Sequence, residues 1–254
     1  RRAVVVAAGA LGTPQLLQRS GLDAEGTVGR NLHIHPACWV GARYEEEVRG
    51  WEGVMQSYYV DQWEPQGILL EATFTPLAFG GAWLLGAGAD HQRAMLDFGH
   101  VGSIGVHLSD RSSGRVRLGA EDAIRASYDL TREDADRLAF GIARAAEVHF
   151  AAGASEVYPN IPRAGVLRRE NLAAFESARF KPSELRLEAF HPMGTARIGE
   201  PGEGACATDG SLHGAEALYV ADASLFPTSV GVNPMMTVIA FAKQVARGIA
   251  ERTT

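Results

Sequence analysis

The histidine at position 191 stands among residues that suit it to proton transfer. His191 lies between Phe190 and Pro192 and precedes the glycine of a turn, Gly194. These neighbours should fix its ring in a partly apolar cavity. An imidazole has an unperturbed pKa of about 6.5, so a modest effect of the surroundings makes it a base near neutral pH. Taken alone, a histidine of this kind is more often structural than catalytic.

A second stretch with chemical content lies near the end of the chain. Residues 218–221 predict a short buried strand that ends on the acidic Asp222. Asn233 suits the N-cap of a following helix, and Pro234 suits its first position. Residues 235–249 are almost all apolar or small, which predicts a buried helix whose positive N-terminal end points at an anionic or electron-rich ligand. An ordinary core helix with an ordinary cap explains these residues equally well.

The start of the chain predicts a strand, a glycine-rich turn and a helix. Residues 3–8 are an apolar run of the buried type, and residues 9–12 form the turn. Thr13 is placed to cap the helix, Pro14 fits its first turn and Gly21 is placed to end it. This order indicates one limb of an α/β nucleotide-binding domain. Because residues 218–221 are a second short apolar run of the buried kind that a turn and a helix follow, we expect residues 3–8 and 218–221 to lie side by side in one sheet. The turn either lets the backbone approach a ligand or is simply tight.

The pattern changes between residues 37 and 119. Short apolar or alternating runs are separated there by Gly, Pro and Asp, which predicts an antiparallel sheet. The runs are residues 38–42, 68–74, 101–108 and 115–118. Large apolar side chains of this segment either line a hydrophobic pocket or fill the core of the domain. They are Trp39, Ile68, Leu69, Leu70, Phe74, Leu77, Phe79, Trp83 and Leu84.

An amphipathic helix follows this segment. Thr131 opens it with a capping box in which Asp134 replaces the usual Glu or Gln. Apolar residues then recur at intervals of three and four, and Gly153 is placed to end the helix.

The bulk properties exclude several classes of protein. The chain has 254 residues, 46% of them hydrophobic, and a net charge of −6, which argues against a nucleic-acid partner. Cys38 and Cys206 are far apart, and His33 with His35 offers too few ligands, so we expect neither a disulfide framework nor a metal site. No apolar run reaches transmembrane length. We expect a cytoplasmic protein, although the chain opens like the middle of a domain and so carries no targeting information.

Four segments, read together, resemble signatures of the glucose–methanol–choline (GMC) oxidoreductases and follow the family's order. The first is residues 9–22, with Asp23 where the family has Gly, and the second is residues 29–35, similar to G-x-N-L-x-D-H with Ile34 in place of Asp. The third is residues 191–199, similar to H-P-x-G-T-x-R-x-G with Ala196 where Cys is common. The fourth is residues 222–237, similar to the C-terminal flavin-contacting region. Within the family, residues 29–36 and 150–157 look most like the long-chain fatty alcohol oxidase branch.

This resemblance implies an α/β FAD-binding domain with an inserted α+β substrate domain built on an antiparallel sheet. Residues 1–36 and 196–254 would then belong to the FAD-binding domain, and residues 37–195 would form the substrate domain. The family's N-terminal β-α-β unit, whose G-x-G-x-x-G loop cradles the FAD pyrophosphate, has no match in the chain. We therefore expect an incomplete FAD-binding domain that binds FAD weakly and is inactive on its own.

The resemblance also implies residue roles. His191 would take the hydroxyl proton of an alcohol as its carbon delivers hydride to flavin N5, and Asn233 would donate a hydrogen bond to the same oxygen. The positive end of the helix at Pro234 would face the flavin pyrimidine edge, where negative charge builds. Asp222 would bind the flavin polyol or the nearby backbone. The cofactor contacts implied in this way are Ala8, Gly9, Asp222, Ala223, Asn233, Pro234 and Met235.

The substrate expected from the apolar residues of the middle segment is an apolar alcohol rather than a sugar. A sugar site needs several convergent polar groups, and the segment offers few. Two alternatives stay open: an FAD-containing lyase of the same family, and a non-catalytic fragment that keeps only the fold. The sequence does not identify the electron acceptor.

Overall fold

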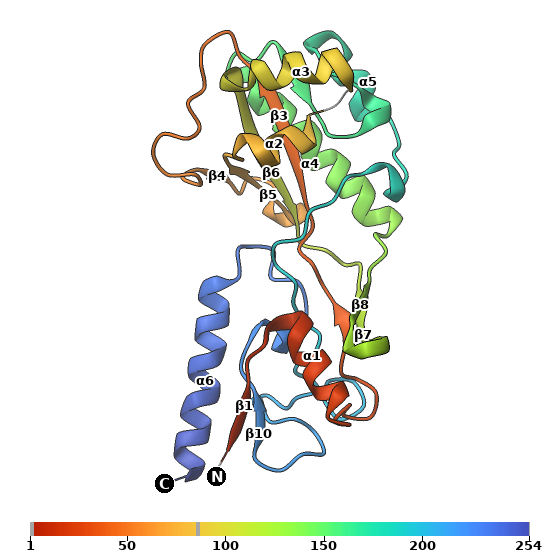
Figure 1. Ribbon diagram of the computed structural model, residues 1–254, viewed down its shortest axis with the longest axis vertical. Coiled ribbons are helices and arrows are strands. Elements are labelled where there is room, and N and C mark those ends of the chain that lie inside the picture. The colour runs from red at the N-terminus through yellow and green to blue at the C-terminus, as the bar shows by residue number, and fades with distance from the viewer. Residues whose placement is uncertain (1–2, 85–86, 254) are drawn as a thin grey trace. The chain divides into compact units, whose positions relative to one another are not determined.

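The computed structural model describes residues 3–84 and 87–253 (Figure 1). The chain forms two compact units. Unit 1 consists of Arg1–His35, Ser109–Leu130 and Ala189–Thr254, and unit 2 of Pro36–Leu108 and Thr131–Glu188. The expected middle domain, residues 37–195, differs from unit 2 because residues 109–130 and 189–195 belong to unit 1.

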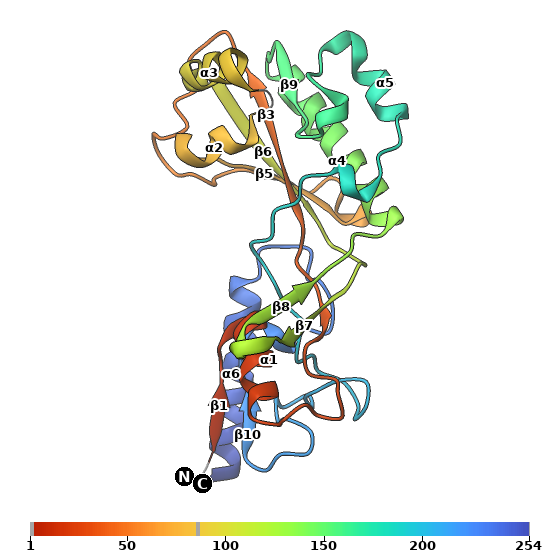
Figure 2. The same cartoon turned by 45° about the vertical axis from the view of Figure 1, so that its right-hand side comes forward.

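Unit 1 contains a parallel pair of strands from opposite ends of the chain. β1 (Val4–Val6) pairs with β10 (Leu218–Val220), with Val5 opposite Tyr219, and the two lie side by side in both ribbon views (Figures 1 and 2). The predicted pairing of these runs is therefore confirmed. Their predicted burial holds only in part, because Val6 is buried whereas Val4 and Val5 are each 48% exposed.

The helix after β1 starts earlier than predicted. α1 spans Gly9–Arg19, so Thr13 and Pro14 lie inside it and the predicted cap at Thr13 is wrong. The Thr13 hydroxyl has other partners: it accepts from the backbone N–H of Ala8 (3.1 Å) and donates to the carboxylate of Asp222 (2.5 Å). The glycine-rich turn is thus the first turn of the helix. Thr13 does not cap a helix start because its hydroxyl is bound to the distant Asp222.

The end of α1 agrees with the sequence. Gly21 follows the C-cap Ser20 with φ of +71°, a conformation that favours glycine. The backbone N–H of Leu22 donates to the carbonyl of Leu17 at 2.9 Å, which closes the last turn.

The C-terminal helix is more exposed than its composition predicts. α6 spans Met235–Thr253, so it begins one residue after the predicted start, and the carbonyl of Pro234 accepts from Val238. Val245 is buried, but Met235 and Met236 are each 70% exposed. The prediction of a buried helix is therefore wrong for this chain, because the described residues pack against only one stripe of a helix that is apolar on several sides.

A three-stranded antiparallel sheet completes unit 1. It has the order β2 (Arg30–Leu32), β7 (Gly114–Leu118) and β8 (Ile124–Ser127). The run 115–118 was expected in the sheet of the middle domain, and this expectation is wrong. Its backbone pairs instead with β2, where the N–H of Val116 donates to the carbonyl of Gly29 at 2.7 Å.

Unit 2 is built on a five-stranded antiparallel sheet, as predicted for the runs 38–42, 68–74 and 101–108. Its order is β4 (Tyr59–Val60), β5 (Ile68–Ala72), β6 (Val101–Leu108), β3 (Ala37–Arg43) and β9 (Glu156–Tyr158). In the ribbon of Figure 2 the long central strands β3 and β6 run side by side.

Helix α4 (Arg132–Ala151) packs on one face of this sheet. The Thr131 side chain accepts from the backbone N–H of Asp134, and Gly153 follows the helix with φ of +96°, so both predicted ends are confirmed. A Cβ on Gly141 would lie 2.6 Å from Val106, which shows how closely the helix approaches β6.

The remaining helices of unit 2 are short. They are α2 (Leu77–Trp83), α3 (Gly88–Leu96) and α5 (Leu172–Ser177). Single 3-10 turns occur in both units at Glu64–Gln66, Phe98–His100, Ala120–Asp122, Pro162–Ala164, Arg169–Asn171, Pro182–Glu184 and Ala223–Leu225. No helix in the described ranges is both long enough and apolar enough to cross a membrane.

Most of the large apolar residues noted in the middle segment fill the core of unit 2. Trp39 and Leu84 are buried in one cluster, and Trp39 stacks on Trp83 with ring centroids 6.1 Å apart. Leu77 and Phe79 are 47% and 67% exposed. Core packing is therefore the role of most of these side chains, since they contact one another rather than line a cavity.

Candidate active site

His191 lies against a second histidine of unit 1, His35. Their Nδ1 atoms are 3.0 Å apart, and the rings stack with centroids 5.2 Å apart and an interplanar angle of 30°. His35 is buried and His191 is half-buried. In a hydrogen bond between two Nδ1 atoms, one ring donates and the other accepts. When His191 donates, its Nε2 is unprotonated and carries the lone pair that a base needs. When His35 donates, Nε2 of His191 carries the ring proton and cannot act as a base.

The segment around His191 is held by backbone pairing within unit 1. Met193 and His33 exchange backbone hydrogen bonds of 2.8 and 3.0 Å, and the N–H of Gly194 donates to the carbonyl of Ala223 at 3.0 Å. Gly194 has φ of +86°, and a Cβ there would lie 2.5 Å from the carbonyl oxygen of Asn31. Only glycine fits this position, so the turn fixes the path of the chain beside His191.

Thr195, which follows Gly194 in this segment, also supports helix α1. Pro14 lacks an N–H, so it leaves the carbonyl of Ala10 without its usual partner four residues on. The hydroxyl of Thr195 donates to that carbonyl at 2.7 Å. The His191 segment and α1 are thereby joined through a buried hydrogen bond.

His35 is positioned by a buried carboxylate. Asp110 accepts at 3.2 Å from the backbone N–H groups of both Ile34 and His35, and at 3.0 Å from the hydroxyl of Tyr128. Burial acts to raise the pKa of the Asp110 carboxyl, but the polar side chains of His33 and Ser229 and the hydrogen bond from the Ile34 N–H outweigh it, so the pKa lies below its ordinary value. Asp110 is thus an ionised acceptor that holds the backbone of the 33–35 segment.

Asp222 joins the two strand–turn connections of unit 1. One carboxylate oxygen accepts from the Gly9 N–H (2.9 Å) and the Thr13 hydroxyl (2.5 Å), and the other accepts from the N–H (2.8 Å) and hydroxyl of Ser224. Its four acceptor positions are therefore filled by the chain. Of the two roles that the resemblance left open, contact with nearby backbone is the one seen here.

The other expected cofactor contacts lie at three places in unit 1. Ala8 and Gly9 form the start of α1, and the carbonyl of Ala223 accepts from Gly194 and Phe226. Asn233, which is exposed, and Pro234 directly precede α6, whose first residue is Met235. The structure thus brings Gly9 to Asp222, while the convergence of Asn233 on His191 stays a prediction.

Sequence reasoning assigned no role in the chemistry to His35 and did not single out Asp110. His35 was visible as the second histidine of the 33–35 segment, but its contact with His191 spans 156 positions. Asp110 lies in no local motif, and its bonds to the 34–35 backbone span about 75 positions. Long-range contacts of this kind leave no periodic signal in a single sequence.

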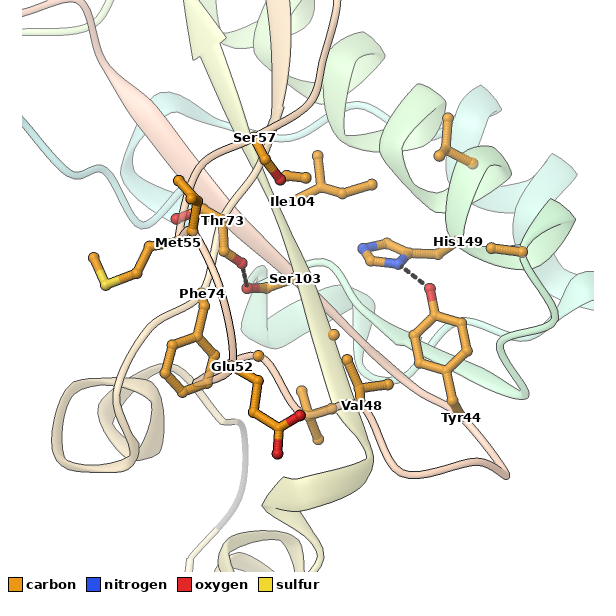
Figure 3. Close-up of a pocket in the computed structure, with 17 residues that line it drawn as sticks. Tyr44, Val48, Glu52, Met55, Ser57, Thr73, Phe74, Ser103, Ile104 and His149 are labelled. Atoms are coloured by element: carbon orange, nitrogen blue, oxygen red, sulfur yellow. Dashed lines mark hydrogen bonds between the residues drawn. The ribbon is translucent and has the colours of Figure 1, made fainter.

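Unit 2 contains a cavity of about 430 Å³ between α4, the start of β6 and the loop after β3 (Figure 3). Phe74 and Met55 line it on one side and Ile104 on another. On the remaining side the Tyr44 hydroxyl lies 2.7 Å from Nδ1 of His149. The cavity therefore combines apolar side chains with the Tyr44–His149 pair and with further polar residues, Glu52, Ser57, Thr73 and Ser103.

The Tyr44–His149 pair is uncharged at neutral pH. Burial lowers the pKa of His149 to about 4, although its hydrogen bond to the backbone of Val40 acts in the opposite direction. Its Nε2 lies 3.1 Å from the Val40 carbonyl and must donate, so Nδ1 accepts from the Tyr44 hydroxyl. Burial also raises the pKa of Tyr44 above its ordinary value.

Comparison with known families identifies the chain. Sequence profiles of GMC oxidoreductases match residues 110–242 and residues 1–37. The first match covers more than half of the chain, so the chain belongs to the GMC oxidoreductase family. The members of this family are FAD-dependent flavoenzymes, which confirms FAD as the cofactor that the sequence motifs implied.

Among curated relatives, a GMC-type oxidoreductase of Mycobacterium tuberculosis is 39% identical over 248 residues, which are 96% of this chain and 39% of that protein. A long-chain-alcohol oxidase of Arabidopsis thaliana is 30% identical over 274 aligned residues, with 98% of this chain and 37% of that protein covered. The chain thus spans about two fifths of the length of these relatives.

Solved structures show the same fold. Pyridoxine 4-oxidase from Mesorbium loti gives a TM-score of 0.65 at 21% identity, with 97% of this chain and 51% of that chain covered. A formate oxidase gives a TM-score of 0.67 at 19% identity, with coverages of 99% and 54%. At these identities the likeness concerns the fold alone.

Proposed function

We propose that this chain belongs to an FAD-dependent alcohol oxidoreductase in which His191 accepts the proton of the substrate hydroxyl. The contact between His191 and His35, with 3.0 Å between Nδ1 atoms, is the observation that carries the proposal. It occurs in the segment that resembles the family's H-P-x-G-T-x-R-x-G signature. A histidine whose second nitrogen is engaged by a fixed partner has the orientation that a general base requires.

The start of α6 fits a flavin. Met235 and Met236 are each 70% exposed and Val232 is 46% exposed, so apolar surface is available to the face of a flat ring. The first backbone N–H groups of a 19-residue helix lie at the same place, and they favour an electron-rich ring edge. FAD, when bound, supplies the acceptor for the hydride of the substrate carbon.

The chain's own residues handle the proton. In this proposal the Nε2 atom of His191 takes the hydroxyl proton, which makes the oxygen alkoxide-like and eases loss of hydride from the adjoining carbon. Asn233 donates an amide N–H to the same oxygen. A base and a donor placed in advance lower the barrier without reorganisation during the reaction.

His35 sets the protonation pattern of His191. Nε2 of His191 is a base only when its Nδ1–H donates to Nδ1 of His35. His35 must then carry its own proton on Nε2. Asp110 fixes the backbone of His35 through a 3.2 Å hydrogen bond, so His35 acts as a positioning residue for the base.

We further propose that unit 1 is part of the FAD-binding domain and that unit 2 carries the substrate-binding surfaces. The substrate is an apolar alcohol. Two observations support this choice: the long-chain-alcohol oxidase of Arabidopsis thaliana is 30% identical to the chain, and the cavity of unit 2 is lined by Met55, Phe74 and Ile104 beside the neutral Tyr44–His149 pair. An apolar wall gains about 0.8 kcal/mol for each methylene that it buries.

His191→Ala in the complete protein tests the base. We expect FAD content to stay at the wild-type level while flavin reduction by an alcohol slows by about 10²–10⁴-fold, the usual loss for a general base. Anaerobic stopped-flow absorbance measures the rate, and the flavin-to-protein absorbance ratio measures the content. His213→Ala is the matched control, because His213 is also half-buried in unit 1 and its ring Nε2 bonds a backbone carbonyl, that of Gly199, at 2.8 Å. Loss of FAD in His191→Ala, or an unchanged rate, would show that His191 is not the base.

A further inference from the structure

One face of the three-stranded sheet in unit 1 carries four arginines. The antiparallel register places Arg30 of β2 opposite Arg115 of β7, and Arg117 of β7 opposite Arg125 of β8. Residues two apart on a strand share a face, so Arg115 and Arg117 point the same way, and the buried Val116 points to the other side. Like charges directly opposite each other destabilise a sheet. Sheet stability therefore does not account for this arrangement.

These arginines have no acidic partner within residues 3–84 and 87–253. Exposed ion pairs of the described residues, such as Arg132 with Asp136 and Arg19 with Asp122, join other side chains. The Nε atom of Arg115 is buried without a hydrogen-bond acceptor in the same ranges. Burial, and then the charges of Arg117 and Arg30, lower the pKa of Arg115 below its ordinary value. A buried N–H donor without an acceptor is costly in free energy. The Arg115 guanidinium is therefore suited to bind a ligand that supplies an acceptor oxygen.

A polar cavity of about 530 Å³ adjoins this face and shares Arg30 with it. Arg197 lines the same cavity, and its guanidinium is oriented by bonds to the Glu203 carbonyl (3.1 Å) and to Oδ1 of Asn31 (3.4 Å). A guanidinium has five N–H donors, so further donors of Arg197 remain for a ligand. Ser113 adds a hydroxyl, and Glu203, whose side chain is exposed, is the acidic residue among those that line the cavity.

We propose that Arg30, Arg115 and Arg197 form a binding site for a phosphate group. Arg30 lies opposite Arg115 on the sheet face and lines the cavity with Arg197, so it links the other two arginines into one candidate site. A phosphate monoester matches this set better than a carboxylate does, because it offers three terminal oxygens and up to two negative charges to several arginine forks. The group belongs either to a soluble phosphorylated molecule or to a lipid head group. The site uses none of the residues assigned to alcohol oxidation.

Titration of the complete protein with inorganic phosphate, at constant ionic strength held with chloride, tests the site. We expect a saturable rise in Tm for the wild type, because a ligand that binds only the folded state stabilises it. Arg30→Gln and Arg115→Gln should each weaken the apparent affinity about tenfold or more, which corresponds to one lost charge-assisted hydrogen bond. Arg132→Gln, which removes an exposed positive charge from α4, should leave the affinity unchanged.

The variants also report on the fold. Arg30→Gln removes one member of a like-charged pair, so without phosphate its Tm should equal or exceed that of the wild type. A second assay separates the two sources of phosphate. Co-sedimentation with phosphatidic acid vesicles, but not with phosphatidylcholine vesicles, and its loss in Arg30→Gln, identify a lipid head group; binding of glycerol 3-phosphate without vesicle binding identifies a soluble ligand. The proposal is overturned if phosphate raises Tm no more than chloride does and the vesicles do not bind, or if both glutamine variants keep the wild-type affinity.

Discussion

The pairing of His191 with His35 makes the protonation pattern of one ring depend on the other. The Nδ1–Nδ1 distance of 3.0 Å requires one donor and one acceptor. Removing the acceptor should leave His191 free to rotate and to exchange tautomers. We expect His35→Phe in the complete protein to slow flavin reduction by about 10–100-fold, by analogy with the loss of the outer hydrogen-bond partner of a metal-binding histidine.

A pH profile separates this positioning role from a purely structural one. In His35→Phe the limb of kcat/KM against pH that reports the base should move, because the partner of His191 has changed. His35→Asn keeps an acceptor oxygen and should recover part of the rate. His213→Phe is the matched control, since His213 is half-buried in the same unit. A slower enzyme with an unshifted pH profile, and no recovery with Asn, would contradict the role of His35.

His149 makes a pH-dependent contribution to stability. Its pKa is about 4 in the folded protein because of burial, and about 6.5 in an unfolded chain. Between these values the unfolded state binds a proton that the folded state does not, so the free energy of unfolding falls as pH falls from 6.5 to 4. The shift corresponds to a loss of about 3 kcal/mol across that window.

Urea unfolding at several pH values measures this loss. His149→Gln keeps a donor for the Val40 carbonyl and an acceptor for the Tyr44 hydroxyl but does not titrate. We expect its stability curve to be flatter than the wild-type curve between pH 6.5 and 4. His213→Gln should keep the wild-type slope, and parallel curves for the wild type and His149→Gln would show that His149 is not responsible.

At the scale of elements, helix α1 depends on a distant hydroxyl. Pro14 cannot donate to the carbonyl of Ala10, and Thr195 does so instead at 2.7 Å. Thr195→Val should lower the free energy of unfolding by about 1–3 kcal/mol, since it leaves a buried carbonyl without a donor. Chemical denaturation of the variant measures this change.

A double-mutant cycle shows whether the proline is the reason. Pro14→Ala restores a backbone N–H that can donate to Ala10, so Thr195→Val should cost less in that background than in the wild type. Equal costs in both backgrounds would mean that the hydroxyl stabilises the protein in another way.

The elements also show what a single sequence can predict. The pairing of β1 with β10, the cap at Thr131 and the glycine ends at Gly21 and Gly153 follow from apolar runs and local capping chemistry. The helix ends need no knowledge of distant contacts, whereas the strand pairing joins opposite ends of the chain and was predicted from two similar apolar runs; each of these predictions was correct.

The features that were predicted wrongly depend on distant residues. Thr13 lies inside α1 because Asp222, 209 positions away, accepts its hydroxyl. The run 115–118 pairs with β2 of unit 1, although its alternation suits either sheet. His35 became part of the candidate site only through its contact with His191. In each case the local sequence pattern predicted the kind of element or residue, whereas contacts with distant residues determined its partners.

At the scale of the whole molecule, the chain passes between its two units at four places, after residues 35, 108, 130 and 188. The candidate base and its partner lie in unit 1, while the cavity that Met55, Phe74 and Ile104 line lies in unit 2. Proton transfer and substrate selection are therefore assigned to different units. Variants of unit 2 should change substrate preference more than they change the rate with a good substrate.

The final prediction concerns the length of the substrate chain. If an apolar surface of unit 2 binds the alkyl chain, each methylene gains about 0.8 kcal/mol, so kcat/KM should rise about fourfold for each added carbon until the surface is covered. Steady-state kinetics with linear primary alcohols measures this slope, and glucose, which requires convergent polar groups, should be a poor substrate.

A variant of unit 2 locates the binding surface. Val148 lies on α4 and lines the cavity beside His149, so Val148→Trp should fill part of that space and shorten the preferred alcohol. Glu147→Gln, on the same turn of the helix but outside the lining, is the control. An unchanged length preference in Val148→Trp would place the alkyl chain elsewhere. A flat response to chain length in the wild type, or a preference for glucose, would contradict the apolar substrate while leaving the role of His191 to be judged by flavin reduction.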